Sequence, residues 1–183
     1  MNEMTGPSDE AGDLAQQVAQ ALGGRTVATA ESITSGNLAA ALAAAQDASQ
    51  WLRGSVVAYS RQVKFSVLGV DRGPVVTATC ARQMAIGVAS LLGADISVAT
   101  TGVGGPDAEE GQPAGTAFIA VGAQDRCGVK QYQLDGEPAQ VVHLSTIQAL
   151  RDLAAAVTAG VFSRTEHQAA RAGKPVASVD GCH

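Results

Sequence analysis

The sequence predicts an α/β protein, a three-layer α/β/α sandwich around a mixed, mostly parallel sheet. In the first half of the chain, segments typical of buried strands alternate with segments of helical periodicity. Nearer the C-terminus, two strand-like segments follow each other directly, which makes the sheet mixed. Two glycine-rich loops each follow a buried strand. If those strands are parallel, both loops lie at the carboxyl edge of the sheet, where ligands of open α/β sheets bind.

The composition is that of one domain with tails. The 183 residues are 46% hydrophobic and 16% charged, enough for a substantial core. A net charge of −5 without a Lys/Arg cluster argues against a nucleic-acid partner. No apolar run approaches the ~20 residues that cross a bilayer, which argues against a membrane partner. We expect flexible tails at 1–8 and 163–183 around one domain at 9–162.

Cysteine and histidine usage predicts a cytoplasmic protein without a metal site. The three cysteines are widely spaced and form no CxxC pair, so neither a disulfide framework nor a zinc site is expected; they are Cys80, Cys127 and Cys182. His143 and the two histidines of the C-terminal tail have no partner at ligand spacing. The acidic, polar N-terminus is unlike a signal peptide, and free cysteines suit a reducing cytoplasm.

The first elements have clear patterns. Apolar residues at every fourth position predict a helix over 11–22 that ends at a Gly-Gly pair. Small and β-branched residues predict a buried strand over 26–30, and the Ala/Leu-rich segment 38–45 has high helix propensity. The polar segment 46–49 is expected to be a loop, with Trp51 packed under it.

A strand and a short helix come next. The segment 55–59 is rich in β-branched residues and predicts a strand. Ser60 is suited to cap a helix over 60–68. In that helix we expect Val63 and Val67 to face the core.

The remaining elements alternate in a similar way. The segment 116–121 is apolar on both faces and is therefore expected in the interior of the sheet, whereas 129–134 is more polar and is expected at an edge. In order, the expected elements are a helix from a cap at Thr77 or Thr79 to Gly93, strands over 96–100, 116–121 and 129–134, and a helix over 138–157.

A polar turn joins the strand 26–30 to the helix 38–45. It contains Glu31, Ser32, Thr34, Ser35 and Gly36. A sharp strand-to-helix turn aims backbone N–H groups at one point, which attracts an anion or an oxyanion. The simpler alternative is that Thr34 or Ser35 only caps the helix. Glu31 could orient a neighbour, although alternation along a strand puts adjacent side chains on opposite faces.

Tyr59 and Lys64 lie on either side of a predicted strand-to-helix junction. Such a junction can direct both side chains to the same edge of the sheet. A lysine desolvated there has a lowered pKa and can act as a base. The alternative is an ordinary surface lysine, as most lysines are.

A second glycine-rich loop follows the strand 96–100. The segment Thr101-Gly102-Val103-Gly104-Gly105-Pro106-Asp107 lacks both the dinucleotide fingerprint and the Lys-Ser/Thr of a P-loop. It is either a tight loop that lets the backbone approach a ligand or a purely structural turn.

Taken together, these motifs make the sequence similar to the C-terminal domain of the competence-damage-inducible CinA proteins. The resemblance covers about 14–157. It rests on Ala30-Glu31-Ser32-Ile33-Thr34-Ser35-Gly36, Tyr59-Ser60-Arg61-Gln62-Val63-Lys64, Gly102-Val103-Gly104-Gly105-Pro106 and Pro113-Ala114-Gly115-Thr116. Stand-alone members of this family act as nicotinamide mononucleotide deamidases.

The resemblance implies a catalytic set. In the family the serine of the first motif is the proposed nucleophile, which corresponds to Ser32 here, and the tyrosine and lysine that assist it correspond to Tyr59 and Lys64. The chain differs from the family in three places. Ser35-Gly36 stands where two glycines are usual, Arg61 stands where asparagine is usual, and Asp135-Gly136-Glu137 lacks the arginine of a Gly-Asp-Arg segment.

The implied activity is that of an amidohydrolase that converts nicotinamide mononucleotide to nicotinate mononucleotide and ammonia, without metal or organic cofactor. The backbone N–H groups expected to hold the oxyanion are those of Ile33, Thr34, Ser35 and Gly36. The groups expected to bind the substrate phosphate are Gly102, Gly104 and Gly105 with Thr116. The alternative function is a catalytically weak or inactive nucleotide-binding or protein-interaction module of the same fold. A homo-oligomer is expected in either case.

Overall fold

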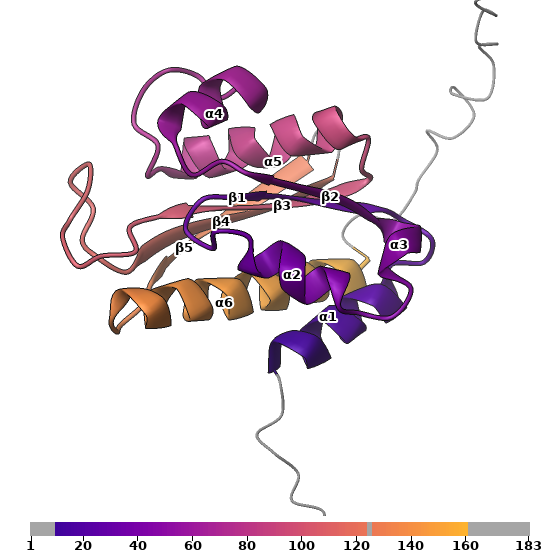
Figure 1. Ribbon diagram of the computed structural model, residues 1–183. Coiled ribbons are helices and arrows are strands. Elements are labelled where there is room, and N and C mark those ends of the chain that lie inside the picture. Colours follow the sequence, from indigo (N-terminus) through magenta and orange to yellow (C-terminus); the bar gives the residue numbers. More distant parts are fainter. Residues whose placement is uncertain (1–9, 124–125, 161–183) are drawn as a thin grey trace, which may run out of the picture.

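A central sheet with helices on both faces forms the fold (Figure 1). The computed structural model describes residues 10–123 and 126–160. Helices α1, α2 and α6 cover one face and helices α4 and α5 the other (Figure 1). This arrangement confirms the predicted α/β class. The tails expected at 1–8 and 163–183 lie outside the described residues.

The sheet has five strands in the order β2-β1-β3-β4-β5. β1 pairs in parallel with both β2 and β3, while β4 pairs antiparallel with β3 and β5. The sheet is therefore mixed, and all strands except β4 share one direction. β4 is interior and β5 is an edge, as predicted. The bounds are β1 Val27–Glu31, β2 Leu52–Val57, β3 Ile96–Gly102, β4 Thr116–Ala123 and β5 Arg126–Gln133.

Three helices bury one face of the sheet. They are α1 Glu10–Ala21, α2 Asn37–Ala43 and α6 Pro138–Thr158. Their apolar side chains meet those of β1, β3 and β4 in one core, which includes Val18, Leu22, Val27, Leu38, Leu42, Ile96, Ile119, Leu150 and Leu153. None of the helices among the described residues is both long and apolar enough to span a membrane.

One predicted loop contains a helical turn instead. Residues Ala48–Trp51 form α3, which begins in the polar segment 46–49 that was expected to be a loop. Trp51 is buried as expected, and its indole Nε1 donates a hydrogen bond to the carbonyl oxygen of Gln46 at 3.1 Å. The anchored indole and the loop carbonyl close this turn, which local polarity alone does not indicate.

The other face is covered by α5 Ala78–Leu92 and α4 Arg61–Val67. Thr77 caps α5, because its side chain accepts a hydrogen bond from the backbone N–H of Cys80 at 3.0 Å. The α4 prediction was wrong in one respect, since Val67 is 45% exposed. The inward positions of α4 and its C-terminal cap are Lys64 and Leu68, spaced one turn apart and both buried.

α4 and α5 approach each other closely at Gly87. A Cβ on Gly87 would lie 2.0 Å from the carbonyl oxygen of Leu68, the residue that caps α4. Only glycine fits at this point of α5. The contact therefore sets the distance between α5, which packs on the sheet, and α4, which carries Lys64.

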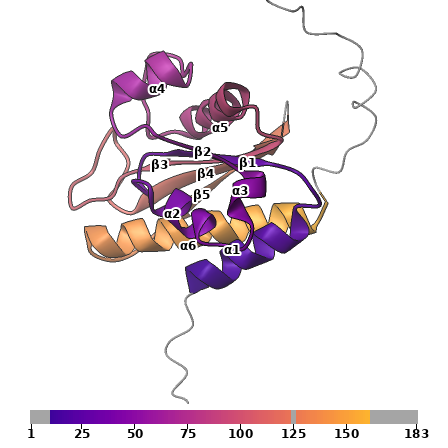
Figure 2. The same ribbon diagram turned by 45° about the vertical axis from the view of Figure 1, so that its right-hand side comes forward.

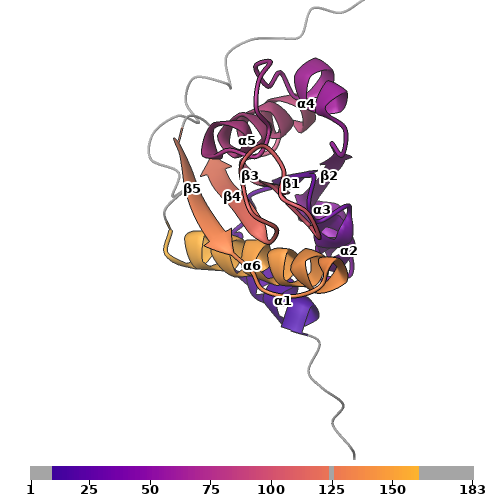
Figure 3. The same ribbon diagram turned by 90° about the vertical axis from the view of Figure 1, so that its left-hand side faces the viewer.

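The carboxyl ends of β1 and β3 lie side by side. Because these strands are parallel, the turn 32–36 and the loop 103–115 meet at one end of the sheet, as predicted. α4 lies at the same end (Figures 1 and 2), which faces the viewer in Figure 3. β2 ends at Val57, so Tyr59 belongs to the connection into α4 and not to a strand.

Candidate active site

A lysine and a serine meet at this end of the sheet. Ser32 directly follows β1, and its backbone N–H donates to the carbonyl oxygen of Thr100 at 3.0 Å. Lys64 projects inward from α4, so that its Nζ lies 2.9 Å from Ser32 Oγ. Ser32 is 8% exposed and Lys64 only 2%. The two side chains form a buried pair drawn from segments 32 residues apart.

The Nζ of Lys64 is surrounded by three oxygen atoms. Besides Ser32 Oγ, it donates to the carbonyl oxygens of Ala58 at 2.8 Å and Tyr59 at 3.3 Å. In the neutral form, the two N–H groups of the amine can stay on these carbonyls while its lone pair faces the hydroxyl of Ser32. Desolvation by burial lowers the pKa of Lys64.

Charged neighbours act on Lys64 in both directions. Glu109 and Glu110 raise the pKa of Lys64 and Arg61 lowers it, all by less than burial lowers it. Cys80 raises the pKa of Lys64 only as a thiolate. Burial raises the pKa of the Cys80 thiol to about 11, so this thiol is uncharged at neutral pH and its influence is absent there.

The carboxylate of Glu31 organises the turn beyond β1. Its Oε2 accepts from the backbone N–H groups of Gly36 at 2.9 Å and Leu38 at 3.1 Å, and its Oε1 accepts from that of Ala39 at 2.8 Å. Gly36 is the N-cap of α2 and has no side chain to do this. The expectation that Thr34 or Ser35 caps the helix was therefore wrong. The cap is a side chain from the preceding strand.

Of the four backbone N–H groups that were expected to hold the oxyanion, two are already engaged within the turn. The N–H of Gly36 is bound by Glu31, and that of Ser35 donates to the carbonyl oxygen of Ser32 at 3.2 Å. These two amides are engaged within the turn, contrary to expectation. The N–H groups of Ile33 and Thr34 have no acceptor among residues 10–123 and 126–160. Ile33 lines the pocket beside the serine–lysine pair, whereas Thr34 is fully buried and does not line it.

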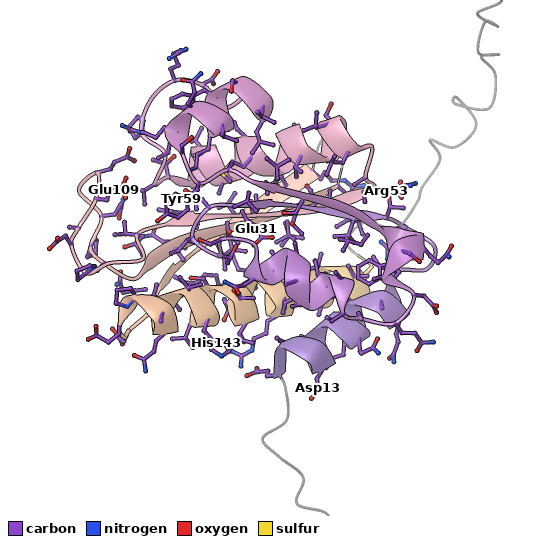
Figure 4. All side chains as sticks on the ribbon, in the orientation of Figure 1. Asp13, Glu31, Arg53, Tyr59, Glu109 and His143 are labelled. Atoms are coloured by element: carbon purple, nitrogen blue, oxygen red, sulfur yellow. The ribbon has the colours of Figure 1, made fainter. Side chains whose placement is uncertain are left out.

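A pocket of about 510 Å³ opens beside the pair. Its walls come from the turn after β1, the junction between β2 and α4, the loop after β3 and the start of α6. The polar and charged side chains in the wall are Ser32, Ser35, Tyr59, Arg61, Lys64, Thr101, Asp107 and Glu109. In Figure 4, Glu31 lies inside the fold, while Tyr59 and Glu109 lie toward the end where the pocket opens.

Three of the four residues that were expected to bind the substrate phosphate lie in the pocket wall. Gly102, Gly104 and Gly105 line the pocket. Thr116 does not, because it is fully buried and its Oγ1 donates to Gln133 Oε1 at 3.1 Å. A Cβ on Gly102 would lie 2.3 Å from the carbonyl oxygen of Thr116, so this glycine also permits close contact between β3 and β4.

Thr34 and Gly36 also lie outside the pocket wall. Thr34 is fully buried, and its Oγ1 donates to Glu31 Oε2 at 2.8 Å. Both residues therefore serve the turn itself. Ser35 does line the pocket, with a left-handed φ of 51°, and its Oγ donates to the carbonyl oxygen of Ser32 at 3.3 Å. The usual glycine of the family would adopt this conformation without strain.

Tyr59 contacts the pair through its backbone. Its carbonyl oxygen lies 3.3 Å from Lys64 Nζ, while its side chain is 75% exposed. The phenol has no hydrogen bond to any residue that the structure describes. It lines the pocket from the solvent side.

An ion pair fixes the outer wall. Arg61 pairs with Glu110, and the other carboxylate oxygen of Glu110 accepts from the backbone N–H groups of Val75 and Val76, both at 2.7 Å. Neither the sequence motifs nor periodicity indicated Glu110. The described residues contain no group of three or more His, Cys, Asp or Glu side chains placed to hold a metal ion.

The fold and the site define a class: an α/β domain whose mixed sheet carries a buried serine–lysine pair at the carboxyl edge of its parallel strands. Comparison with known families agrees with this description. The model of the CinA C-terminal domain matches residues 11–157. The chain belongs to the CinA C-terminal domain family.

Relatives and solved structures extend the match. The CinA-like protein of Frankia casuarinae is 40% identical over 141 residues, covering 74% of this chain and 32% of the relative. The CinA-like protein of Mycolicibacterium vanbaalenii is 38% identical over 151 residues, which cover 79% of this chain and 36% of the relative. The chain thus spans about a third of these curated relatives.

The solved structures are of similar size. A CinA superfamily protein from Klebsiella pneumoniae has a TM-score of 0.78 at 33% identity, covering 81% of this chain and 98% of that one. A CinA superfamily protein from Escherichia coli has a TM-score of 0.76 at 30% identity, and the match covers 84% of this chain and 97% of that one. The likeness includes the mixed sheet and its helices.

Proposed function

We propose that this chain is an amidohydrolase that converts nicotinamide mononucleotide to nicotinate mononucleotide and ammonia. The observation that carries the proposal is the 2.9 Å separation between Ser32 Oγ and the buried Nζ of Lys64. A hydroxyl is a weak nucleophile until a base takes its proton. Lys64, with its pKa lowered by burial, is suited to be that base.

The reaction follows from this pair. Lys64 Nζ accepts the proton of Ser32 as Oγ attacks the carboxamide carbon, which gives a tetrahedral oxyanion. The oxyanion collapses, the C–N bond breaks, and Lys64 returns the proton to the leaving nitrogen, so that ammonia departs from an acyl-serine ester. Water, deprotonated by Lys64, then attacks the ester, and the carboxylate leaves as Ser32 regains its proton. The reaction consumes one water for each nucleotide and needs no other reactant.

The backbone amide of Ile33 is the proposed oxyanion donor. Ile33 directly follows the nucleophile and lines the pocket, and its N–H has no acceptor in the part of the chain that the structure describes. Preorganised amide donors act where charge develops in the transition state and cost no reorganisation then.

The pocket suits a ligand that carries charges of both signs. At about 510 Å³ it has the size of small-molecule sites. The N–H groups of Gly104 and Gly105 have no acceptor among the described residues, which suits a phosphate. The carboxylates of Asp107 and Glu109 line the same loop and favour the cationic ring of the nucleotide.

A second candidate is a module of the same fold that binds the nucleotide or a protein without turnover. It is favoured by Ser35, which has a strained left-handed φ beside the nucleophile, and by Arg61, whose guanidinium lines the pocket. A homo-oligomer and a cytoplasmic location stay predictions. Sedimentation of the purified chain tests the first of them.

Ammonia release separates the two candidates. Purified full-length chain is incubated with nicotinamide mononucleotide, and ammonia and nicotinate mononucleotide are measured together with binding by calorimetry. The amidohydrolase gives both products in equal amounts, and Ser32→Ala gives neither while still binding the substrate. Binding without either product in the folded wild type favours the module. In that case, Ser35→Gly combined with Arg61→Asn should restore turnover.

A further inference from the structure

Glu31 is a fully buried carboxylate that the proposed reaction does not use. Beside the three backbone amides at the start of α2, it accepts from three hydroxyls. Thr34 Oγ1 donates to Oε2 at 2.8 Å, and Ser55 Oγ donates to Oε1 at 3.1 Å. Thr29 Oγ1 lies 3.1 Å from Oε1 and 2.7 Å from Ser55 Oγ and donates to both. Both carboxylate oxygens are thus fully engaged.

The burial of the Glu31 carboxylate needs a structural explanation. A buried carboxylate without a cation is costly unless hydrogen bonds replace the lost water. Here most of those bonds come from one turn and the first turn of one helix, where a negative charge is also favoured by the helix dipole. The carboxylate therefore ties the end of β1 to the start of α2, and residues 32–35 span the gap between them.

The same bonds decide which amides face a ligand. Without Glu31, the N–H groups of Gly36, Leu38 and Ala39 would need other acceptors, since Gly36 supplies none. With Glu31 these three amides are occupied, and among the described residues of this turn the amide that is both unbound and next to the pocket is that of Ile33.

We propose that Glu31 is the positioning residue of the nucleophile turn. It fixes the Ile33 amide as the oxyanion donor and acts on the reaction only through that backbone. This inference rests on the proposed function. Glu31 is not among the groups that shift the pKa of Lys64, which are Cys80, Glu109, Glu110 and Arg61. Its removal should weaken transition-state binding and leave the titration of Lys64 unchanged.

The experiment compares Glu31→Gln with Ser55→Ala in the full chain. Glutamine keeps the shape of the glutamate side chain, but an NH₂ group replaces one carboxylate oxygen. This group cannot accept hydrogen bonds from the backbone amides. Ser55→Ala removes one donor to the same carboxylate and leaves the turn intact. For Glu31→Gln we expect kcat to fall about 10²-fold, the typical loss for one oxyanion donor, with KM and the acid limb of the pH profile unchanged. Ser55→Ala should stay close to wild type.

Pyridine-3-boronic acid provides a readout apart from turnover. It adds to a serine hydroxyl as a tetrahedral anion, which resembles the oxyanion. Its affinity should fall in Glu31→Gln by the same factor as kcat. In ¹⁵N-labelled wild type, boronate should shift the amide proton of Ile33 downfield and leave those of Gly36, Leu38 and Ala39 in place. Because this last measurement uses the wild type, it tests which amide is the oxyanion donor even if Glu31→Gln does not fold.

The outcomes are distinct. An active wild type beside a Glu31→Gln variant with unchanged kcat and boronate affinity overturns the role of Glu31 alone. So does a boronate adduct that shifts the amides of Gly36, Leu38 or Ala39. A folded wild type that neither releases ammonia nor forms the adduct overturns the proposed function and this inference together.

Discussion

The carbonyl oxygen of Leu68 lies where a side chain on Gly87 would begin. Gly87→Ala should therefore push α4 away from α5. Alanine normally stabilises a helix relative to glycine by ~1 kcal/mol, but here we expect a net loss of about 1–3 kcal/mol, as for an overpacked core. Because α4 carries Lys64, kcat should fall as well.

Gly128→Ala is the matched control for this variant. A Cβ on Gly128 meets nothing within 4 Å, and its φ is not left-handed. Denaturant unfolding and steady-state kinetics measure both variants. If Gly87→Ala is as stable and active as Gly128→Ala, the contact does not position α4.

Replacing Lys64 tests the base. Lys64→Met keeps the aliphatic volume but not the proton acceptor, so kcat should fall ~10²–10⁴-fold with little change in substrate affinity. Lys64→Arg should be nearly as damaging, because guanidinium does not give up its proton. Turnover and calorimetric affinity are measured after circular dichroism has shown that both fold. Lost affinity with retained turnover would make Lys64 a phosphate ligand instead.

Lys64→Met should also make the protein more stable at neutral pH. The pKa of Lys64 lies below its ordinary value of 10.5 in the folded state. The unfolded chain therefore binds more protons between the lowered pKa and 10.5, and the free energy of unfolding of the wild type rises with pH across that window. In Lys64→Met this rise should be absent. Denaturant unfolding at several pH values checks it, and an unchanged slope would contradict it.

The pH profile should respond to the charges around Lys64. A base must be unprotonated, so kcat/KM should fall as pH drops through the pKa of Lys64. Glu109 raises this pKa and Arg61 lowers it. Glu109→Gln should therefore move the acid limb to lower pH, and Arg61→Asn should move it to higher pH. Shifts of the same sign, or none, would mean that another group controls the limb.

Ser35→Gly should stabilise the turn. Ser35 has a φ of 51°, and the left-handed conformation costs a residue with a Cβ about 1–2 kcal/mol. Glycine avoids this cost but is more flexible in the unfolded chain, so we expect a net gain of about 1 kcal/mol in unfolding free energy. Thermal unfolding measures it. Ser49→Gly is the control, because its φ is not positive. A loss of stability in Ser35→Gly would show that the weak hydrogen bond from Ser35 Oγ matters more than the strain.

Much of the site could be predicted because its parts are local in sequence. Alternating strands and helices predicted that the turn at Ser32 and the loop at Gly102 share an edge, and they do. Lys64 stood out from its place after a predicted strand-to-helix junction and as one residue of a motif, but not from periodicity. Apolar periodicity assigned the inward positions to Val63 and Val67, since it treats a lysine as a surface residue.

The parts that were missed depend on contacts distant in sequence or on side-chain direction. Strand alternation pointed Glu31 away from Ser32, and it gave no sign that the carboxylate reaches forward to α2. Glu110 meets Arg61 and the Val75 amide only in the folded chain. Thr116 follows a glycine that suits a ligand loop, but its hydroxyl is directed to Gln133 on the neighbouring strand.

The separate origin of Ser32 and Lys64 has a consequence for the chain before it is folded. The serine directly follows β1 and the lysine lies in α4 after β2, so they meet only after these strands have paired and α4 has packed on α5. A nascent or damaged chain has a serine of ordinary reactivity and a lysine that is protonated in water. Under the proposed mechanism, such a chain does not attack the amide groups of other molecules, because the base reaches the serine hydroxyl only in the finished sheet.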